Sequence, residues 1–203
     1  MPRKPYTKGR AAQERILDTA LKTISTQGYG STSLADIARE ADMTPAGLLH
    51  HFGSKENLLV EILRRRDFVD TQRLAPLGTG PVPSSLQVAH HNVRVPGLIH
   101  LFVNVEADAS DPNHPGHEYF RSRYETVSNR VATDISIRQN DGRFDPSVDA
   151  HQVATMIIAL LDGLQSRWAV DPSSVNILET IMTFWNNFVE EKLTVESINA
   201  YMA

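Results

Sequence analysis

The chain has 203 residues, of which 41% are hydrophobic and 22% charged, with no cysteine and a formal net charge of −4. This composition is typical of a globular protein and argues against a mostly disordered, collagen-like or disulfide-stapled chain. The absence of cysteine excludes disulfides, thiolate metal sites, iron–sulfur clusters and cysteine nucleophiles.

The charge is unevenly distributed along the chain. Residues 1–66 carry a net charge of +4 and residues 67–203 a net charge of −8. Parts of opposite sign indicate two domains with different partners. We therefore expect one domain over residues 1–66, and a second domain over 67–203 that is too acidic to wrap a nucleic acid.

No segment contains the roughly 18 uninterrupted apolar residues that a membrane-spanning helix needs. The basic N-terminus, residues 1–5, is followed by no apolar run, so it does not resemble a secretory signal. The sequence predicts a soluble, cytoplasmic protein without a membrane partner.

The first predicted element is a flexible basic arm over residues 1–11, which contains no acidic residue. Its basic residues are Arg3, Lys4, Lys8 and Arg10. From about Ala12, apolar residues recur with the period of a helix. This helix is expected to end at Gly28, because glycine favours helix C-termini.

A short helix from Leu34 to about Ala41 comes next. Ser33 is a suitable N-cap for it, and Asp36 completes an approximate capping box three residues later. A turn over residues 42–44 then leads out of this helix.

A second short helix is expected over residues 45–51. Thr44 can cap it, and Pro45 occupies its first position, where a missing N–H group costs nothing. After a break at Gly53, Ser54 caps a longer helix over residues 55–73 that would connect the two domains.

The rest of the chain also predicts helices, since no segment shows strand alternation flanked by turns. A Pro/Gly-rich loop is expected over residues 75–85. The expected helices lie at about 84–94, 96–110, 117–139, 147–168, 173–192 and, as a short tail, 195–201. The predicted fold class is all-α.

Two short helices joined by a three-residue turn, behind a third packing helix, describe a helix-turn-helix. Residues 32–59 strongly resemble the TetR/AcrR family of bacterial transcriptional regulators, and the resemblance covers about residues 10–66. Its most specific parts are Asp36-Ile37-Ala38, His51-Phe52, Ser54-Lys55-Glu56 and Leu58-Leu59.

The resemblance implies a three-helix DNA-binding domain followed by a larger helical domain for ligand binding and dimerisation. In the family, the third helix enters the major groove of DNA. Here that helix has a small apolar face, which lets the backbone approach base edges and suits thymine methyl groups. The predicted DNA-binding residues are Ser33, Thr44, Pro45, Ala46, Gly47, Leu49, His50 and Lys55.

These residues have different expected roles. Thr44 and His50 are expected to hydrogen-bond bases or phosphates. Ser33 and Lys55 begin helices, where backbone N–H groups favour phosphate. The third helix offers no Arg, Asn or Gln for bidentate base contacts, so phosphate contacts and DNA shape are expected to contribute much of the specificity.

Two features leave alternatives open. Leu49 departs from the family, which usually has an aromatic phosphate-contacting residue there, and His50 is expected to take over part of that role. The basic arm either tracks the DNA backbone or minor groove, or is a disordered solubilising tail. Without the motif, Lys55 would be read as a solvated surface lysine.

Two helices of the acidic half have apolar faces too broad for one side of a small core. In the family, the last two long helices pair with those of a second copy to form a four-helix dimer interface. Burial inside the single chain is the alternative interpretation. The predicted dimer residues are Ile157, Leu160, Leu164, Ile181, Phe184, Trp185 and Phe188.

The resemblance also implies a ligand cavity among the helices of the acidic half. Each candidate is alternatively an ordinary core or surface residue. The candidates are His91, Phe102, Glu106, Phe120, Tyr124, Met156 and Trp168.

Histidines gather between residues 90 and 117, but His114 and His117 lie at a breaker loop with poorly defined ligand spacing, so we predict no metal site and no cofactor. No Gly-rich phosphate loop, G-x-S-x-G or H-E-x-x-H motif is present, and no catalytic residue is predicted. The sequence thus predicts a ligand-responsive homodimeric regulator, most simply a repressor, that a small-molecule effector releases from a near-palindromic double-stranded DNA operator. The alternatives are a helical protein-binding adaptor and, less favoured, an enzyme.

Overall fold

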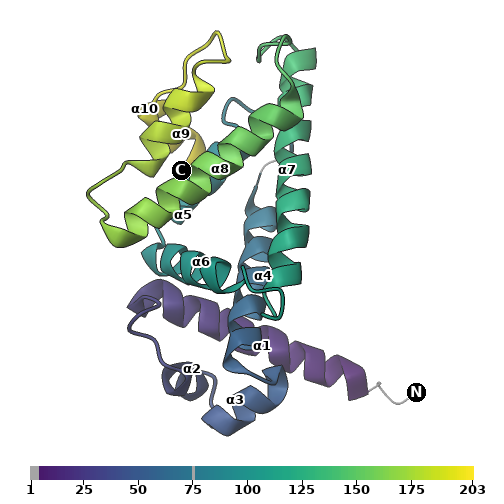
Figure 1. Ribbon diagram of the computed structural model, residues 1–203, viewed down its shortest axis with the longest axis vertical. Coiled ribbons are helices and arrows are strands. Elements are labelled where there is room, and N and C mark those ends of the chain that lie inside the picture. Colours follow the sequence, from purple (N-terminus) through teal and green to yellow (C-terminus); the bar gives the residue numbers. More distant parts are fainter. Residues whose placement is uncertain (1–4, 75) are drawn as a thin grey trace. The chain divides into compact units, whose positions relative to one another are not determined.

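The computed structural model describes residues 5–74 and 76–203, and every regular element within them is an α-helix (Figure 1). The all-α prediction is therefore confirmed. The helices are α1 (Pro5–Gln27), α2 (Leu34–Glu40), α3 (Pro45–Phe52), α4 (Lys55–Arg73), α5 (Ser84–Asn92), α6 (Pro96–Asp108), α7 (His117–Asn140), α8 (Ala150–Val170), α9 (Ile177–Trp185) and α10 (Val195–Met202).

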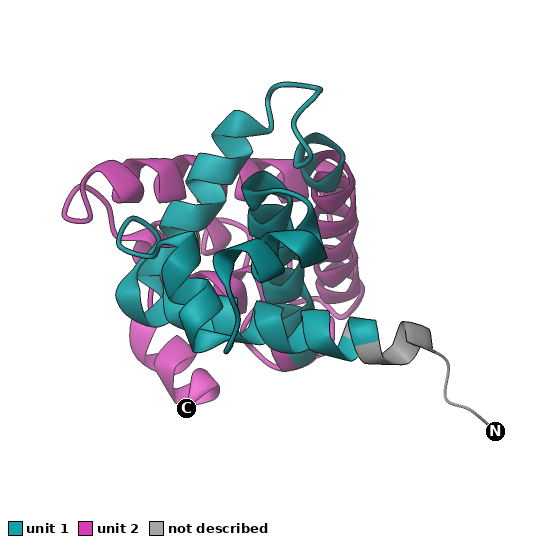
Figure 2. Cartoon of the chain, turned by 90° about the horizontal axis from the view of Figure 1, so that it is seen from below, with its two compact units in different colours: residues 1–72, 95–120 teal, residues 73–94, 121–203 magenta. Residues whose placement is uncertain are grey.

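The chain divides into two compact units (Figure 2). Unit 1 consists of residues 1–72 and 95–120, and unit 2 of residues 73–94 and 121–203. The segment 95–120, which the sequence-based boundary assigns to the C-terminal domain, thus packs with the N-terminal helices.

Unit 1 is built around the apolar face predicted for the first helix. Ile16, Ala20 and Ile24 of α1 are buried, together with Leu48 of α3 and Leu58 of α4. Burial of each isoleucine and leucine side chain stabilises the unit by roughly 1.5–3 kcal/mol, and that of alanine by less. These contacts fix the helices that carry the candidate site.

Helix α6 approaches α1 very closely within unit 1. At Gly97, an added Cβ would lie 2.2 Å from the backbone oxygen of Ile24 and 3.1 Å from the Cα of Gly28. The absence of a side chain at Gly97 therefore permits this packing, and it explains how residues after position 95 join unit 1.

Helix α4 carries a buried charged cluster in unit 1. The Arg66 side chain is 4% exposed and pairs with Asp67 at 3.1 Å and with Asp70 at 4.0 Å. Its guanidinium also lies over the ring of Phe102, 5.0 Å from the centroid. The Tyr119 hydroxyl donates to Asp67 at 2.6 Å, so the carboxylate partner of Arg66 is held in place.

Unit 2 has Trp185 at its centre. This side chain is fully buried, its Nε1 donates to Ser85 Oγ at 2.8 Å, and its ring meets Phe144 edge-on at 5.2 Å. Buried Ile135, Ile157, Ile181 and Ile198 come from four different helices. The aromatic group therefore joins α5 and α9 through both apolar contact and a satisfied indole N–H.

Three predicted boundaries are wrong. Helix α1 already begins at Pro5, so Lys8 and Arg10 belong to a helix rather than to a flexible arm, while Arg3 and Lys4 lie outside the described residues. Helix α8 begins at Ala150 instead of residue 147, because Asp149 is its N-cap and accepts from Gln152 N–H.

The third error concerns the helix expected over residues 173–192. Helix α9 spans only Ile177–Trp185. Asn186 then closes a loop, since its side chain donates to Leu193 O and accepts from Leu193 N–H, each at 2.9 Å. Lys192 also donates to Asn186 O at 2.7 Å. These contacts turn the chain back before another helical turn forms.

Helix α8 is the one helix among the described residues that is long and apolar enough to cross a membrane by length and composition. Core helices of soluble proteins pass the same test. Val153, Ala154, Ile157 and Ile158 are buried in the chain itself, and 33% of the apolar window is buried in all.

Candidate nucleic-acid interface

Helix α2 begins with a complete capping box, as the sequence predicts. The Asp36 backbone N–H donates to Ser33 Oγ at 3.1 Å, and the Ser33 backbone N–H donates to Asp36 Oδ2 at 2.9 Å. Arg39 also donates to Asp36 at 2.7 Å. These hydrogen bonds, chiefly those from Ser33, lower the pKa of the Asp36 carboxyl to about 2, so it stays charged at the positive end of the helix.

Helix α3 is defined at both ends by its own sequence. Thr44 Oγ1 accepts from Gly47 N–H at 3.0 Å, and Pro45 occupies the first helical position. Gly53 ends the helix with a φ of +82°, a conformation that L-residues with side chains rarely adopt. The predicted start and end of this helix are confirmed to within one residue.

The anchoring of α3 fixes which of its faces is available. Leu48 has no exposed surface and points into the core of unit 1. Gln13 of α1 donates from Nε2 to His51 O at 3.1 Å, which ties the end of α3 to α1. The opposite, N-terminal face of α3 is consequently the one that a partner can reach.

The residues predicted to contact DNA lie on that accessible side or at its margins. Gly47 and Leu49 are half-buried, and the other six are exposed. The exposed six are Ser33, Thr44, Pro45, Ala46, His50 and Lys55. All eight are contributed by α2, α3, α4 and the residues that cap them, within unit 1. Their assignment to DNA binding remains a prediction.

Lys55 combines a side-chain charge with a helix N-terminus. Ser54 Oγ accepts from Asn57 N–H at 3.0 Å and thereby caps α4, and Lys55 is exposed at the first position. The dipole of a helix favours anions at its N-terminus, and the lysine adds a full positive charge. This corner can therefore hold one phosphate group.

The structure also shows a cavity of about 190 Å³ beside this corner, which the sequence analysis missed. Three helices and a turn contribute to it, and no sequence spacing brings such residues together. Its lining includes Tyr29, Thr32, Leu34, Leu59 and Lys55.

The predicted ligand-binding residues are divided between the two units. Phe102, Glu106 and Phe120 belong to unit 1, and their two phenyl rings meet at a centroid distance of 5.4 Å. The other four belong to unit 2: His91, Tyr124, Met156 and Trp168. Their role in ligand binding remains a prediction.

Unit 2 has a cavity of about 610 Å³ in another place. Arg138, Arg143, Lys192 and Leu193 are among its lining residues, and none of the seven predicted ligand residues is. The pKa of Arg138 is lowered by burial, although Asp134 offsets part of this effect.

Four of the predicted dimer residues lie in the core of unit 2. Ile157, Ile181 and Trp185 are fully buried in the single chain, and Leu164 is 6% exposed. These four are thus buried within the single chain, which is the alternative interpretation of their stripe, and their role in a dimer remains a prediction. A helical apolar stripe looks the same in both cases, so the sequence could not decide between them.

The remaining predicted dimer residues are half-buried: Leu160, Phe184 and Phe188. Phe188 lies beyond the end of α9 and stacks on Phe144 at a centroid distance of 5.4 Å. Its role in a dimer remains a prediction.

The histidines considered as metal ligands make local hydrogen bonds. The His117 Nδ1 lies 2.9 Å from Ala109 O, and His114 Nδ1 accepts from Gly116 N–H at 3.1 Å. Among the described residues, no three His, Cys, Asp or Glu side chains are grouped so that they could hold a metal ion.

Comparison with known proteins gives concordant results. Residues 16–62 match the model of the family described as bacterial regulatory proteins, tetR family. The HTH-type transcriptional regulator BetI of Agrobacterium fabrum is 30% identical over 167 residues, which cover 76% of this chain and 75% of that protein. Such relatives are named as transcriptional regulators and not as enzymes.

Solved structures show the same fold. A transcriptional regulator of Saccharomonospora viridis, solved in complex with choline, is 24% identical with a TM-score of 0.65, covering 90% of this chain and all of that one. A triclosan complex of SmeT, the efflux-pump repressor of Stenotrophomonas maltophilia, is 18% identical with a TM-score of 0.62, covering 91% and 95% of the two chains.

The capped α2–α3 pair with its buried Leu48 and exposed Thr44 face is the helix-turn-helix expected from the sequence. Together with the match over residues 16–62 and the relative aligned over three quarters of its length, it shows that the chain belongs to the TetR family of bacterial transcriptional regulators.

Proposed function

We propose that this protein is a homodimeric transcriptional repressor that binds a near-palindromic double-stranded DNA operator and releases it when a small-molecule effector binds. The observation that carries the proposal is the exposed N-terminal side of α3, held outward by buried Leu48. A short helix anchored in this way can insert into a major groove.

The chemistry of this surface suggests how the operator is read. Pro45 and Ala46 are small and exposed, so they permit close approach of the backbone to base edges and apolar contact with thymine methyl groups. Thr44 Oγ1 already accepts from Gly47 N–H, and its hydroxyl proton remains a donor for phosphate or base acceptors. Ser33 and Lys55 would hold phosphates on either side.

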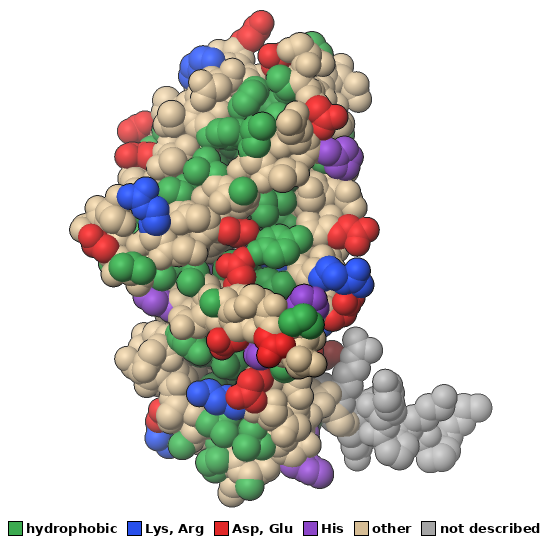
Figure 3. Space-filling view, in the orientation of Figure 1, with side chains coloured by type: hydrophobic (Ala, Val, Ile, Leu, Met, Phe, Trp, Pro, Cys, Tyr) green, Lys and Arg blue, Asp and Glu red, His purple; other side chains and the backbone are tan. Residues whose placement is uncertain are grey.

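A two-fold dimer would place two copies of α3 about 34 Å apart, the separation of successive major grooves. The outward side of α8 in unit 2 is a suitable surface. Its exposed residues include Ala159 and Gly163, and Figure 3 shows apolar side chains over the region in which Figure 1 draws α8 and α9. Small side chains would let the two copies of α8 pack closely.

We assign effector binding to the helices that follow the helix-turn-helix. Candidate positions are the seven predicted ligand residues and the 610 Å³ cavity near Arg138, whose volume lies in the range of small-molecule sites. An effector that binds more tightly to a conformation in which the two helix-turn-helix motifs of the dimer are wrongly spaced for DNA would lower the population of the DNA-binding conformation.

The first experiment selects bound sequences from random double-stranded DNA with the full chain, then measures affinity against salt. We expect an enriched near-palindrome and a steep fall in affinity with salt, because phosphate contacts release counterions. Binding without sequence preference and without a salt dependence would overturn the proposal.

A pair of charge-removing variants tests the assigned surface. Lys55→Gln should weaken operator binding about tenfold, in line with loss of one charged phosphate contact. Lys22→Gln, which removes an exposed lysine of α1, is the matched control and should have little effect. A helical protein-binding adaptor would instead retain its function in the Lys55 variant.

Effector release is tested by adding compounds to the protein–operator complex. Choline and triclosan are suitable first probes because two proteins of the same fold hold them. Release by a compound that also binds the free chain supports an effector-responsive repressor. If operator binding persists throughout a broader screen of metabolites, the ligand-responsive part of the proposal fails.

A further inference from the structure

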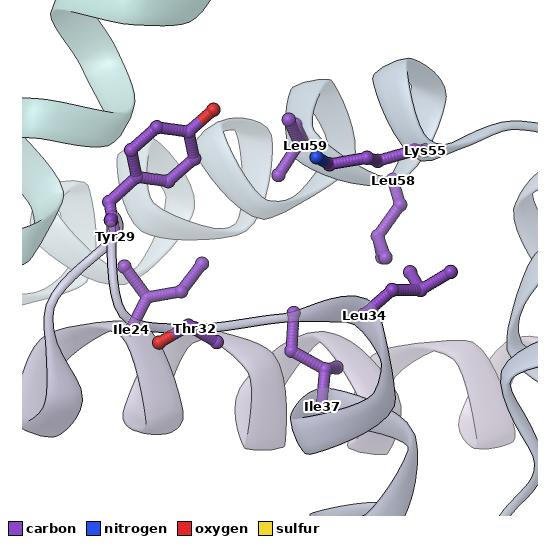
Figure 4. Close-up of a pocket in the computed structure, with 9 residues that line it drawn as sticks. Ile24, Tyr29, Thr32, Leu34, Ile37, Lys55, Leu58 and Leu59 are labelled. Carbon is purple, nitrogen blue, oxygen red and sulfur yellow. The ribbon is translucent and has the colours of Figure 1, made fainter.

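The cavity beside Lys55 is formed entirely within unit 1, by the end of α1, the following turn, α2 and the start of α4 (Figure 4). Its volume is about 190 Å³. Its lining residues are Ile24, Tyr29, Gly30, Thr32, Leu34, Ile37, Lys55, Leu58 and Leu59. Five of these nine are aliphatic, so the cavity has an apolar body with a few polar groups.

The apolar body is of a size that holds one aromatic ring. The aliphatic surface that a ligand can reach comes from Leu34 and Leu59, which are half-buried, because Ile24, Ile37 and Leu58 are only 1%, 3% and 0% exposed. A cavity of about 150 Å³ with a comparable aliphatic lining binds benzene. A ligand with one six-membered ring is therefore of a suitable size for this cavity.

Lys55 provides the charged end of the cavity. In Figure 4 its side chain extends across one side of the cavity, with the ammonium group beside Leu59. Within the described part of the chain, no carboxylate forms an ion pair with it. The neighbouring Glu56 is held by hydrogen bonds from its own backbone N–H and from Ser54, which lower its pKa.

The other polar groups indicate at which end an anion would lie. Thr32 Oγ1 donates to Gly28 O at 2.7 Å and is thereby occupied. The pKa of the Tyr29 hydroxyl is raised by burial and by the negative charge of Asp108. The field of Asp108 disfavours a second negative charge near Tyr29, so a carboxylate would lie at the Lys55 end.

From this arrangement we propose that the cavity binds a small aromatic monocarboxylate, with its ring against the half-buried Leu34 and Leu59 and its carboxylate on Lys55 Nζ. The ligand would occupy the ammonium group that we also assign to an operator phosphate. Bound ligand and DNA would then compete directly for this ammonium group, without a change in the spacing of the two helix-turn-helix motifs in the dimer. Only this competition rests on the proposed function; the binding itself does not.

The binding test uses the full chain without DNA, with benzoate as the probe and benzamide as its uncharged analogue. Methyl-resolved NMR should show benzoate shifting the signals of Leu34 and Leu59, and leaving those of Ile157 and Ile181 unchanged. Benzoate should bind about tenfold more tightly than benzamide, because only the carboxylate forms a charge-assisted hydrogen bond.

Two variants and one control separate the polar and apolar contributions. Lys55→Gln should reduce the affinity for benzoate about tenfold and leave that for benzamide unchanged. Leu59→Phe, which fills the cavity, should weaken both ligands. Lys22→Gln should change neither. Thermal unfolding of each variant establishes that it is folded, and the exposed Lys55 can be replaced without disturbing the core.

The proposal is overturned if benzoate does not bind at millimolar concentrations, if it binds no better than benzamide, or if the shifted methyl groups belong to unit 2. It is also overturned if Lys55→Gln leaves benzoate binding unchanged. In a second arm, saturating benzoate should weaken operator binding by the wild-type chain but not by Leu59→Phe.

The two arms distinguish the two proposals. If no DNA is bound in any condition, the proposed repressor function fails, while the NMR measurements still decide the cavity. If wild type binds benzoate and operator at the same time with unchanged affinities, direct competition is refuted.

Discussion

Asp36 shows how a single side chain fixes the start of α2, the first helix of the helix-turn-helix. Its carboxylate accepts hydrogen bonds from the backbone N–H and hydroxyl of Ser33, and Arg39 donates to the other oxygen. Ser33, Asp36 and Arg39 are close together in the sequence, so this cap can be predicted without a tertiary structure. Its energetic consequence is a change of stability with pH.

The Asp36 carboxyl has a pKa of about 2 in the folded chain, lowered from 3.8. A depressed folded-state pKa gives stability that is fully present above the unfolded value and is lost as the pH falls from about 4 through 2. We expect Asp36→Asn to reduce the loss of stability over this range. Urea unfolding at several pH values measures it, with the exposed Asp42→Asn as control.

If the wild type and Asp36→Asn lose stability in parallel below pH 4, the capping hydrogen bonds do not carry the effect. A similar change in Asp42→Asn would show that net charge, and not the cap, is responsible.

Asp134 is a second carboxylate that accepts backbone hydrogen bonds, but the N–H groups that it binds are distant in sequence. It is 1% exposed and accepts from Gly78 N–H at 2.7 Å and Ser84 N–H at 2.9 Å, and Arg138 Nε lies 3.3 Å away. One carboxylate thus holds the loop before α5 against α7 in unit 2.

We expect Asp134→Ala to lower the free energy of unfolding by about 3–5 kcal/mol, because it leaves buried N–H groups and a buried guanidinium without their acceptor. Denaturant unfolding measures the loss. Asp145→Ala is the control and should cost much less, since that carboxylate accepts only from Ser147. Equal losses in both variants would refute the role of burial.

At the scale of elements, the position of α6 in unit 1 depends on one glycine. A Cβ at Gly97 would collide with the backbone of α1 at Ile24, and backbone cannot swing aside as a flexible side chain can. Helix propensity alone would favour alanine over glycine at this position by about 1 kcal/mol. The two effects therefore have opposite signs.

Gly97→Ala should destabilise the chain by about 1–3 kcal/mol, the usual cost of overpacking. Gly9→Ala places the same methyl group on α1 in open space and should stabilise by up to about 1 kcal/mol. Thermal and denaturant unfolding of the two variants give the comparison. A stabilised Gly97→Ala would show that α6 does not approach α1 so closely.

At the scale of the whole molecule, the proposed dimer requires a surface on which two copies can meet. The buried residues of α8 lie in the core of unit 2, so the proposed interface uses the other side of this helix, around Gly163. A two-fold contact brings each position near its own symmetry mate. A large charged side chain at Gly163 would therefore face its own symmetry mate, and the two like charges would repel each other across the interface.

We expect Gly163→Arg to convert a dimer into monomers and to weaken operator binding about 100-fold, since two linked reading heads gain strongly from avidity. Light scattering after gel filtration and an operator titration measure these effects. Ala200→Arg, an equally large change at an exposed position of α10, is the matched control. A dimeric Gly163→Arg with full operator affinity would refute this interface.

The sequence by itself determined the features that depend on neighbours a few residues away. The caps at Ser33, Thr44 and Ser54 and the glycine after α3 place the helix-turn-helix correctly, because a capping hydrogen bond spans only three residues. The periodic pattern also gave the fold class. It could not tell a core stripe from an interface stripe, since both are apolar at the same spacing.

Only the tertiary structure decided the features that need distant residues. It buried Trp185 against Ser85, and it joined residues after 95 to unit 1 through Gly97. It also assembled the cavity beside Lys55 from three helices and a turn. Such contacts follow from side-chain volume and the closure of long loops, and local spacing in the sequence carries no record of them.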